Sequence, residues 1–155
     1  NRLLELGYDS SKIRTHYLGV DCDRFEFKER LFNPLEPIRF ITVARFIEKK
    51  GIEYGLAAFA KVAQEFENVE YLIIGDGPLL NSIKELIITL GISEKVQLLG
   101  SRTQPEVIEF MKTAHMLLAP SVTGSDGDKE GIPVSMMEAM AMGLPVISTY
   151  HSGIP

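Results

Sequence analysis

Short apolar runs alternate with longer amphipathic stretches along the chain after Pro37. Apolar runs of this length, rich in β-branched residues, are typical of buried strands. They lie at residues 38–44, 69–75, 95–100, 115–121 and 144–149. Between them, apolar residues recur every three or four positions, which predicts amphipathic helices. These helices are expected at residues 51–66, 79–91, 105–114 and about 133–142.

This alternation predicts an α/β fold. Strands joined by helices of this length pair in parallel with right-handed crossovers. Continuously apolar strands are typical of a sheet that is covered on both faces. We therefore expect a doubly wound, Rossmann-like parallel sheet. Such sheets bind ligands beyond the carboxyl ends of their strands, so the loops that follow the strands are where a site is expected.

The chain before the first strand has a weaker pattern. Residues 1–7 have the spacing of a helix, whereas residues 19–37 show no periodicity and are expected to form a linker. The sequence begins inside a helical pattern and stops directly after a strand-like run. We therefore expect it to be a piece of a longer protein.

Charge and composition argue against several classes of protein: nucleic-acid-binding, disulfide-bonded and membrane-spanning proteins. The chain has 16 Lys and Arg against 21 Asp and Glu, a net charge of −5. This balance argues against a nucleic-acid-binding surface, which needs a basic stripe, but it allows a local basic pocket. Cys22 is the single cysteine, so no internal disulfide can form and a reducing cytosol is favoured. No apolar run reaches the roughly 18 to 20 residues that span a bilayer.

The loop after the first strand carries a cluster of basic residues. Arg45 follows the strand, and Lys49 and Lys50 precede the helix that is expected to begin at Gly51. Positive charge is unfavourable at a helix N-terminus unless an anion also binds there. Arg45 and Lys50 are therefore candidates for binding a pair of phosphates. The alternative is a solvated basic turn.

The next two loops carry weaker signals. Gly75 and Gly77 allow a close backbone approach after the second strand, but Leu80 stands where the dinucleotide-binding GxGxxG motif needs its third small residue. A tight strand-to-helix turn is the alternative. In residues 98–103, backbone groups could contact a nucleotide base, and Arg102 could contact a phosphate or face solvent.

The fourth loop, residues 121–131, is long and polar and contains two nearby carboxylates. Asp126 and Asp128 form a DGD triplet, which resembles the metal-binding DxD of one class of sugar transferases. The triplet is short and common, and it lies in a loop with several glycines. We therefore expect no metal site here.

The run at residues 131–147 is apolar apart from Ser135 and Glu138, and we expect it to be buried. A buried carboxylate without partners is costly. Glu138 is therefore expected either to accept backbone N–H groups or to bind the hydroxyls of a ribose. A helix that begins near Pro133 would aim free N–H groups toward Glu130 at the end of the polar loop, which creates an anion site.

Taken in order, these motifs resemble those of a known family. R-x4-KG after the first strand, GDGP after the second and E-G-I-P-x4-E-A-M-A-x-G-x-P-V-I near the end are similar to motifs of the GT4-type glycosyltransferases. These are retaining enzymes of the GT-B fold, in which two Rossmann-like domains face a cleft. Residues 16–25 resemble the family's interdomain segment, although Tyr17 and Leu18 replace its Pro-Asn. DGDKEGIP and STYHSGIP resemble bacterial exopolysaccharide transferases of the colanic acid or amylovoran kind.

The resemblance implies a division of the chain and roles for its residues. Residues 1–24 would finish the N-terminal domain and the interdomain segment, and residues 25–155 would form the C-terminal, donor-binding domain. Arg45, Lys50 and Glu130 are the implied catalytic residues: the first two bind the donor's diphosphate, and Glu130 binds hydroxyls of the donor sugar.

The EX7E motif of the resemblance assigns its second glutamate, Glu138, to the ribose. The amides at 131–134 would assist Glu130, and residues 98–103 would contact the base. The donor-binding residues implied in this way, together with the two glycines after the second strand, are Gly75, Gly77, Leu99, Ser101, Arg102, Gly131, Ile132, Pro133, Val134 and Glu138.

The same resemblance implies the partners. The donor would be a UDP- or GDP-sugar, and a saccharide or lipid-linked acceptor would bind the N-terminal domain. No metal, other cofactor or nucleic acid is expected. The location would be cytoplasmic, with peripheral association of the longer protein at the inner face of the membrane. The isolated chain is expected to bind donor without turnover.

Several other functions fit parts of the sequence. A glycosidase would also use two carboxylates, but it needs no Arg–Lys phosphate pair. A nicotinamide oxidoreductase needs the GxGxxG turn, which is absent from the loop after the second strand. A non-catalytic nucleotide-binding or interaction module and a GT-B epimerase both keep the fold and remain alternatives.

Overall fold

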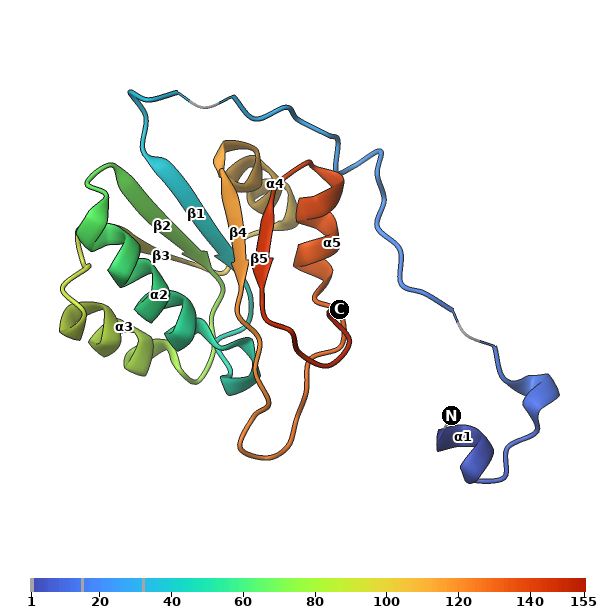
Figure 1. Cartoon of the computed structure of the whole chain (residues 1–155). Helices are drawn as coiled ribbons and strands as arrows, with labels where there is room; N and C mark the ends of the chain where they lie inside the picture. Colours follow the sequence, from blue (N-terminus) through green and yellow to red (C-terminus); the bar gives the residue numbers. More distant parts are fainter. Residues whose placement is uncertain (1, 15, 32) are drawn as a thin grey trace.

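A five-stranded parallel sheet forms the centre of the protein (Figure 1). The computed structural model describes residues 2–14, 16–31 and 33–155. The strands run in the order β3-β2-β1-β4-β5, and each neighbouring pair is parallel. Their bounds are β1 Ile38–Val43, β2 Val69–Ile74, β3 Val96–Gly100, β4 Met116–Ala119 and β5 Val146–Ser148. The predicted α/β fold with a doubly wound parallel sheet is confirmed.

Helices cover both faces of the sheet. Figure 1 shows α2 and α3 on one face, and α4 and α5 on the other. Neighbouring residues of β1 point to opposite faces, as the pleat of a strand requires. Phe40 packs into the core under α2 and α3, and Ile41 packs into the core under α4 and α5. The helices are α2 Ile52–Glu65, α3 Leu80–Thr89, α4 Gln104–Thr113 and α5 Val134–Ala141.

A buried hydroxyl chain links three strands near the middle of the sheet. Thr42 Oγ1 donates to the carbonyl oxygen of Leu118 at 2.6 Å, so the Tyr71 hydroxyl is the donor in its 2.7 Å bond to Thr42. Burial raises the pKa of Tyr71, which keeps this hydroxyl protonated. Because β2, β1 and β4 are joined in this way, the strand ends that carry the loops are held in register.

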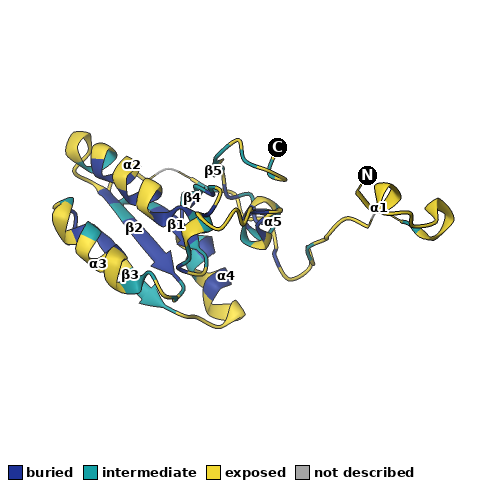
Figure 2. Ribbon diagram, turned by 90° about the horizontal axis from the view of Figure 1, so that it is seen from below, coloured by how far each residue is buried: buried dark blue, intermediate teal, exposed yellow. Residues whose placement is uncertain are grey.

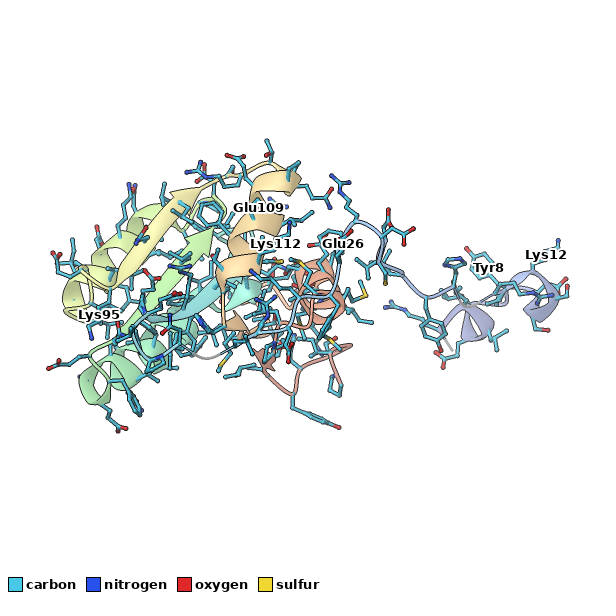
Figure 3. All side chains as sticks on the ribbon, turned by 90° about the horizontal axis from the view of Figure 1, so that it is seen from above. Tyr8, Lys12, Glu26, Lys95, Glu109 and Lys112 are labelled. Atoms are coloured by element: carbon cyan, nitrogen blue, oxygen red, sulfur yellow. The ribbon has the colours of Figure 1, made fainter. Side chains whose placement is uncertain are left out.

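The N-terminal arm extends away from the sheet and is exposed (Figure 2). It contains α1 (Arg2–Glu5), within the predicted helix at 1–7, and the short 3-10 helix η1 (Ser10–Lys12). Figure 3 shows Tyr8 and Lys12 on this arm, far from the sheet. Among the described residues, burial begins at Phe25. The division between residues 24 and 25 stays a prediction.

The expected linker at 19–37 has no helix or strand in its described residues, but part of it is anchored. The guanidinium of Arg30 donates to carbonyl oxygens at the ends of α4 and α5, at 2.6 to 3.3 Å. Cations are stabilising at helix C-termini because the last carbonyls there lack partners. The five acceptors belong to Met111, Lys112, Ala114, Met142 and Gly143.

Lys95, labelled in Figure 3, stabilises the end of α2 in the same way. Its ammonium donates to the carbonyls of Ala63, Phe66 and Glu67 at 2.8 to 3.3 Å. Both cations lie at the edge of the sheet where the helices end. The loops that follow the strands lie at the opposite edge, where the strands end.

The expectation that residues 131–147 are buried is wrong for part of the run. Helix α5 lies near the edge strand β5, so only one side of the helix packs against the sheet. Met136 and Ala139 are buried, whereas Met140 is 64% exposed. Apolar composition alone did not distinguish the buried side of α5 from its exposed side.

We predict that Arg30→Met lowers the free energy of unfolding by about 2 kcal/mol, because the substitution removes the charged donor from two helix ends at once. Urea denaturation of the 155-residue chain measures this change. Lys28→Met is the matched control, since Lys28 makes one 3.3 Å bond to the carbonyl of Lys112 and is exposed. The control is expected to cost less than about 0.5 kcal/mol. Equal losses for the two variants would contradict the anchoring role.

Candidate functional site

The sheet has its topological switch point between β1 and β4. From β1 the chain proceeds through β2 to β3 on one side, and it then returns to place β4 and β5 on the other. Crossovers in opposite directions leave a crevice beyond the carboxyl ends of the two central strands, where ligands bind in doubly wound sheets. The turn after β1 and the loop after β4 both lie at this crevice.

The turn after β1 packs directly onto the end of β4. It contains the short 3-10 helix η2 (Glu48–Lys50) and ends at Gly51, which has a left-handed φ of 58°. A Cβ on Gly51 would lie 1.9 Å from the carbonyl oxygen of Pro120. Only glycine fits this conformation and this contact. The turn therefore brings Lys50 to a small recess that is also lined by Ser121 and Pro133.

Lys50, which lines this recess, forms an ion pair with Glu130. The Lys50 ammonium donates to Glu130 Oε2, and the two side chains are 18% and 11% exposed. The Glu130 backbone N–H also contacts His151 Nε2 at 3.4 Å, in the loop after β5. Two residues that the sequence assigned to the same site, from loops 80 positions apart, therefore form an ion pair.

The loop after β4 is attached to the turn after β1 by two further contacts. Ser125 Oγ donates to a Glu48 carboxylate oxygen at 2.6 Å, and Lys49 pairs with Asp128 at 2.9 Å. The hydrogen bond from Ser125 lowers the pKa of Glu48, and the bond from Lys49 lowers the pKa of Asp128. The Asp128 bond raises the pKa of Lys49. Three consecutive residues of η2 thus each have a partner in one loop.

The DGD carboxylates are engaged within the protein. Asp126 Oδ1 accepts the backbone N–H of Asp128 at 2.9 Å, and the Asp128 carboxylate pairs with Lys49. In residues 2–14, 16–31 and 33–155 no three His, Cys, Asp or Glu side chains are grouped so as to hold a metal ion. These carboxylates shape the loop by folding it on itself and against η2.

Glu138 lies on α5, half-buried, and its Oε1 accepts a 3.3 Å hydrogen bond from Gln104 Nε2. The expected alternative, a carboxylate held by backbone N–H groups of a neighbouring loop, is not what the contact shows. Gln104 is the first residue of α4, whose start is fixed by a capping box between Thr103 and Glu106. Glu138 Oε2 has no such bond to Gln104, and the carboxylate is accessible to a ligand.

Gly75 and Gly77 have a structural role. A Cβ at Gly75 would lie 1.8 Å from the carbonyl oxygen of Ala44, and one at Gly77 would lie 2.6 Å from that of Phe46. The close approach that these glycines permit is therefore to the protein's own backbone. A direct contact between these glycines and a donor stays a prediction.

The other predicted residues lie around the same edge of the sheet. Arg45 is exposed at the end of β1 and, among the described residues, forms no ion pair. Leu99 is half-buried, while Ser101 and Arg102 are exposed beyond β3. Pro133 is buried and has no backbone N–H, so it cannot assist Glu130 by donation. The amides of Gly131, Ile132 and Val134 remain available for that role.

A wide hollow lies away from the switch point. A volume of about 1100 Å³ is lined by Arg39, Glu70 and Gln97 under α4. Arg39 and Glu70 satisfy each other there by an ion pair at 2.5 Å. Arg24 and Arg102 also line this hollow. Because the hollow lies under α4 and not at the switch point, we assign the candidate site from the loops and their chemistry.

Sequence reasoning missed three contacts of the site: Gln104 with Glu138, Ser125 with Glu48, and His151 with the backbone of Glu130. The start of α4 at Gln104 carried a detectable signal, because Thr103 and Glu106 have the spacing of a capping box, although that spacing does not show the contact with Glu138. The other two contacts join distant loops, and the sequence contains no periodic pattern that would show them.

No helix in the described part of the chain has the length and apolar character to cross a membrane.

Comparison with known proteins identifies the family. Residues 23–155 match the family described as glycosyl transferases group 1. The chain is 40% identical to the amylovoran biosynthesis glycosyltransferase AmsK of Erwinia amylovora, over 100% of this chain and 38% of that protein. It is also 40% identical to WcaL of Escherichia coli (strain K12), named as a colanic acid biosynthesis glycosyltransferase, over 99% of this chain and 38% of that protein. The chain thus spans well under half the length of these relatives.

Solved structures share the fold. A glycosyltransferase from Rickettsia africae superposes with a TM-score of 0.77 at 22% identity, over 98% of this chain and 42% of that one. Anabaena HepE, crystallised with UDP and glucose, superposes with a TM-score of 0.76 at 19% identity, over 97% of this chain and 41% of that one. The sheet is therefore one Rossmann-like half of a GT-B glycosyltransferase fold. By its sequence over residues 23–155, the chain belongs to the group 1 glycosyl transferases.

Proposed function

We propose that this chain contains the donor-binding domain of a retaining, GT4-type glycosyltransferase. It binds a nucleotide-diphosphate sugar, and the longer protein transfers the sugar to a saccharide or lipid-linked acceptor held by its N-terminal domain. The observation that carries this proposal is the placement of Lys50 and Glu130 together at the switch point, where doubly wound sheets bind ligands.

The chemistry of the reaction suits these residues. When the sugar leaves, negative charge grows on the diphosphate oxygens. Lys50 and the exposed Arg45 lie on one loop and would stabilise that charge. Positive side chains can supply this stabilisation without a metal. In the proposed same-face mechanism, the leaving phosphate takes the proton of the acceptor, so no protein nucleophile is needed.

Glu130 and Glu138 have separate roles in this proposal. Glu130 accepts hydrogen bonds from hydroxyls of the donor sugar, assisted by backbone amides at the start of α5. Glu138 accepts hydroxyl bonds from the ribose through Oε2, because Gln104 already occupies Oε1. Residues 98–103 contact the base.

The names of relatives support a role in polysaccharide synthesis. AmsK and WcaL are named for amylovoran and colanic acid biosynthesis. We propose the same class of pathway here, in the cytoplasm, with peripheral association of the longer protein at the inner face of the membrane. HepE was solved with UDP, and a mycobacterial relative is named GDP-mannose-dependent, so both bases belong in the test.

Calorimetric titration of the 155-residue chain with UDP, GDP, ADP and their sugar conjugates tests the donor site. We expect one nucleotide series to bind, and we expect Lys50→Ala and Glu138→Ala each to weaken its binding by at least about tenfold, since each removes a charged hydrogen-bonding group. Lys61→Ala and Glu85→Ala, exposed on α2 and α3, are the matched controls and should leave binding unchanged. Binding of no nucleotide, or equal binding by all four variants, would refute the proposal.

Donor binding is expected to be independent of metal. The affinity in excess EDTA should agree with the affinity in millimolar magnesium within about twofold, because Lys50 and Arg45 supply the positive charge at the diphosphate. The same titration in the two buffers measures this ratio. Loss of binding in EDTA would assign the diphosphate to a metal ion.

The 155-residue chain is expected to transfer no sugar. A radiolabelled donor incubated with the chain and a saccharide acceptor should yield no labelled product, because the acceptor site is proposed to lie in the N-terminal domain. The longer protein in the same assay is the positive control. Transfer by the 155-residue chain alone would contradict this assignment.

A further inference from the structure

Lys50 already has a negative partner before any ligand binds. Its ammonium donates to Glu130 Oε2, and both side chains are largely shielded from solvent. Among the described residues, Glu130 is the one charged residue that is buried. An ion pair shielded in this way is screened less by water and salt than a surface pair. Any phosphate that approaches Lys50 therefore meets the charge of Glu130.

The surrounding loops hold Glu130 in this position. On the side of η2, Glu48 and Lys49 bind Ser125 and Asp128 of the same loop. On the other side the turn after β5 packs closely, since a Cβ at Gly153 would lie 3.2 Å from the carbonyl oxygen of Gly131. The loop is therefore held by contacts on both sides of Glu130.

We propose that Glu130 is an internal counter-ion that competes with the diphosphate for Lys50. This inference rests on the proposed donor site. Like charges in one partly buried site repel, so Glu130 weakens the binding of a free nucleoside diphosphate. A donor that still carries its sugar offsets this effect, because the sugar hydroxyls donate hydrogen bonds to Glu130 while the phosphate takes Lys50.

This competition distinguishes donor from product. Before transfer, the bound sugar gives the Glu130 carboxylate new donors and so permits Lys50 to turn to the phosphate. After transfer, the nucleoside diphosphate remains without those hydroxyls. The ion pair between Glu130 and Lys50 then forms again, and the product dissociates. The ion pair thus favours donor over product at the same subsite.

The test is Glu130→Gln, which keeps the size of the side chain and removes its charge. We expect this variant to bind UDP or GDP, whichever the unaltered chain binds, at least about tenfold more tightly. Its preference for the sugar conjugate over the free diphosphate should fall by a similar factor. In a Lys50→Ala background the same substitution should give a clearly smaller gain in diphosphate affinity, because competition for Lys50 is then absent and only the direct repulsion remains.

Asp128→Asn is the matched control. It removes one negative charge from the same loop and keeps a side-chain oxygen that accepts the Lys49 hydrogen bond, and Asp128 pairs with Lys49 and not with Lys50. We expect its diphosphate affinity to change by less than about twofold. If both variants bind the diphosphate more tightly by the same factor, the effect comes from the net charge of the loop, and the inference is overturned.

Two further measurements keep the inference testable if Glu130→Gln does not fold. Glu130→Ala removes the charge and should tighten diphosphate binding in the same direction. In the unaltered chain, the sugar conjugate must bind more tightly than its diphosphate, and the opposite order would overturn the inference. Failure of the unaltered chain to bind any nucleotide would instead refute the donor site itself, so the two failures are distinguishable.

Discussion

The contact between Gly51 and the end of β4 is the constraint on which the site depends. Because a Cβ would overlap the Pro120 carbonyl, the turn after β1 takes its position against the end of β4 only with glycine at residue 51. That position puts three consecutive residues of η2 opposite the loop after β4, and each of them finds a partner there. The hydrogen bonds through Tyr71 and Thr42 stabilise this arrangement because they join β1 and β4, the strands that carry the two loops.

The order of elements was predictable because it rests on local patterns. The runs at 38–44 and 69–75 became β1 and β2 with ends shifted by one residue, and the three- and four-residue spacing in 51–66 became α2. Parallel pairing followed from connection length, and the location of the site followed from the parallel sheet. Lys50 and Glu130 were identified from loop position and motif spacing, and the structure joins them.

The remaining features depend on contacts between distant residues, for which the sequence has no periodic signal. Arg30 appeared to be one charge in an irregular linker, yet it binds carbonyls more than 80 positions away. Met140 has the same apolar character as Met136, but only the position of α5 near the sheet edge decides which of them is buried. The close packing of Gly75 and Gly77 against the turn after β1 likewise required the folded backbone.

The anchoring of Arg30 also affects how this domain could be exchanged between enzymes. Helices α4 and α5 begin near the site, with Gln104 and with the residues after Glu130, and both end at the guanidinium. A chimera joined before Phe25 would carry the anchor together with the helices that it holds. A junction placed after Arg30 would leave both helix ends to a foreign segment, and the resulting loosening would reach the proposed ribose and sugar contacts at the far ends of the same helices.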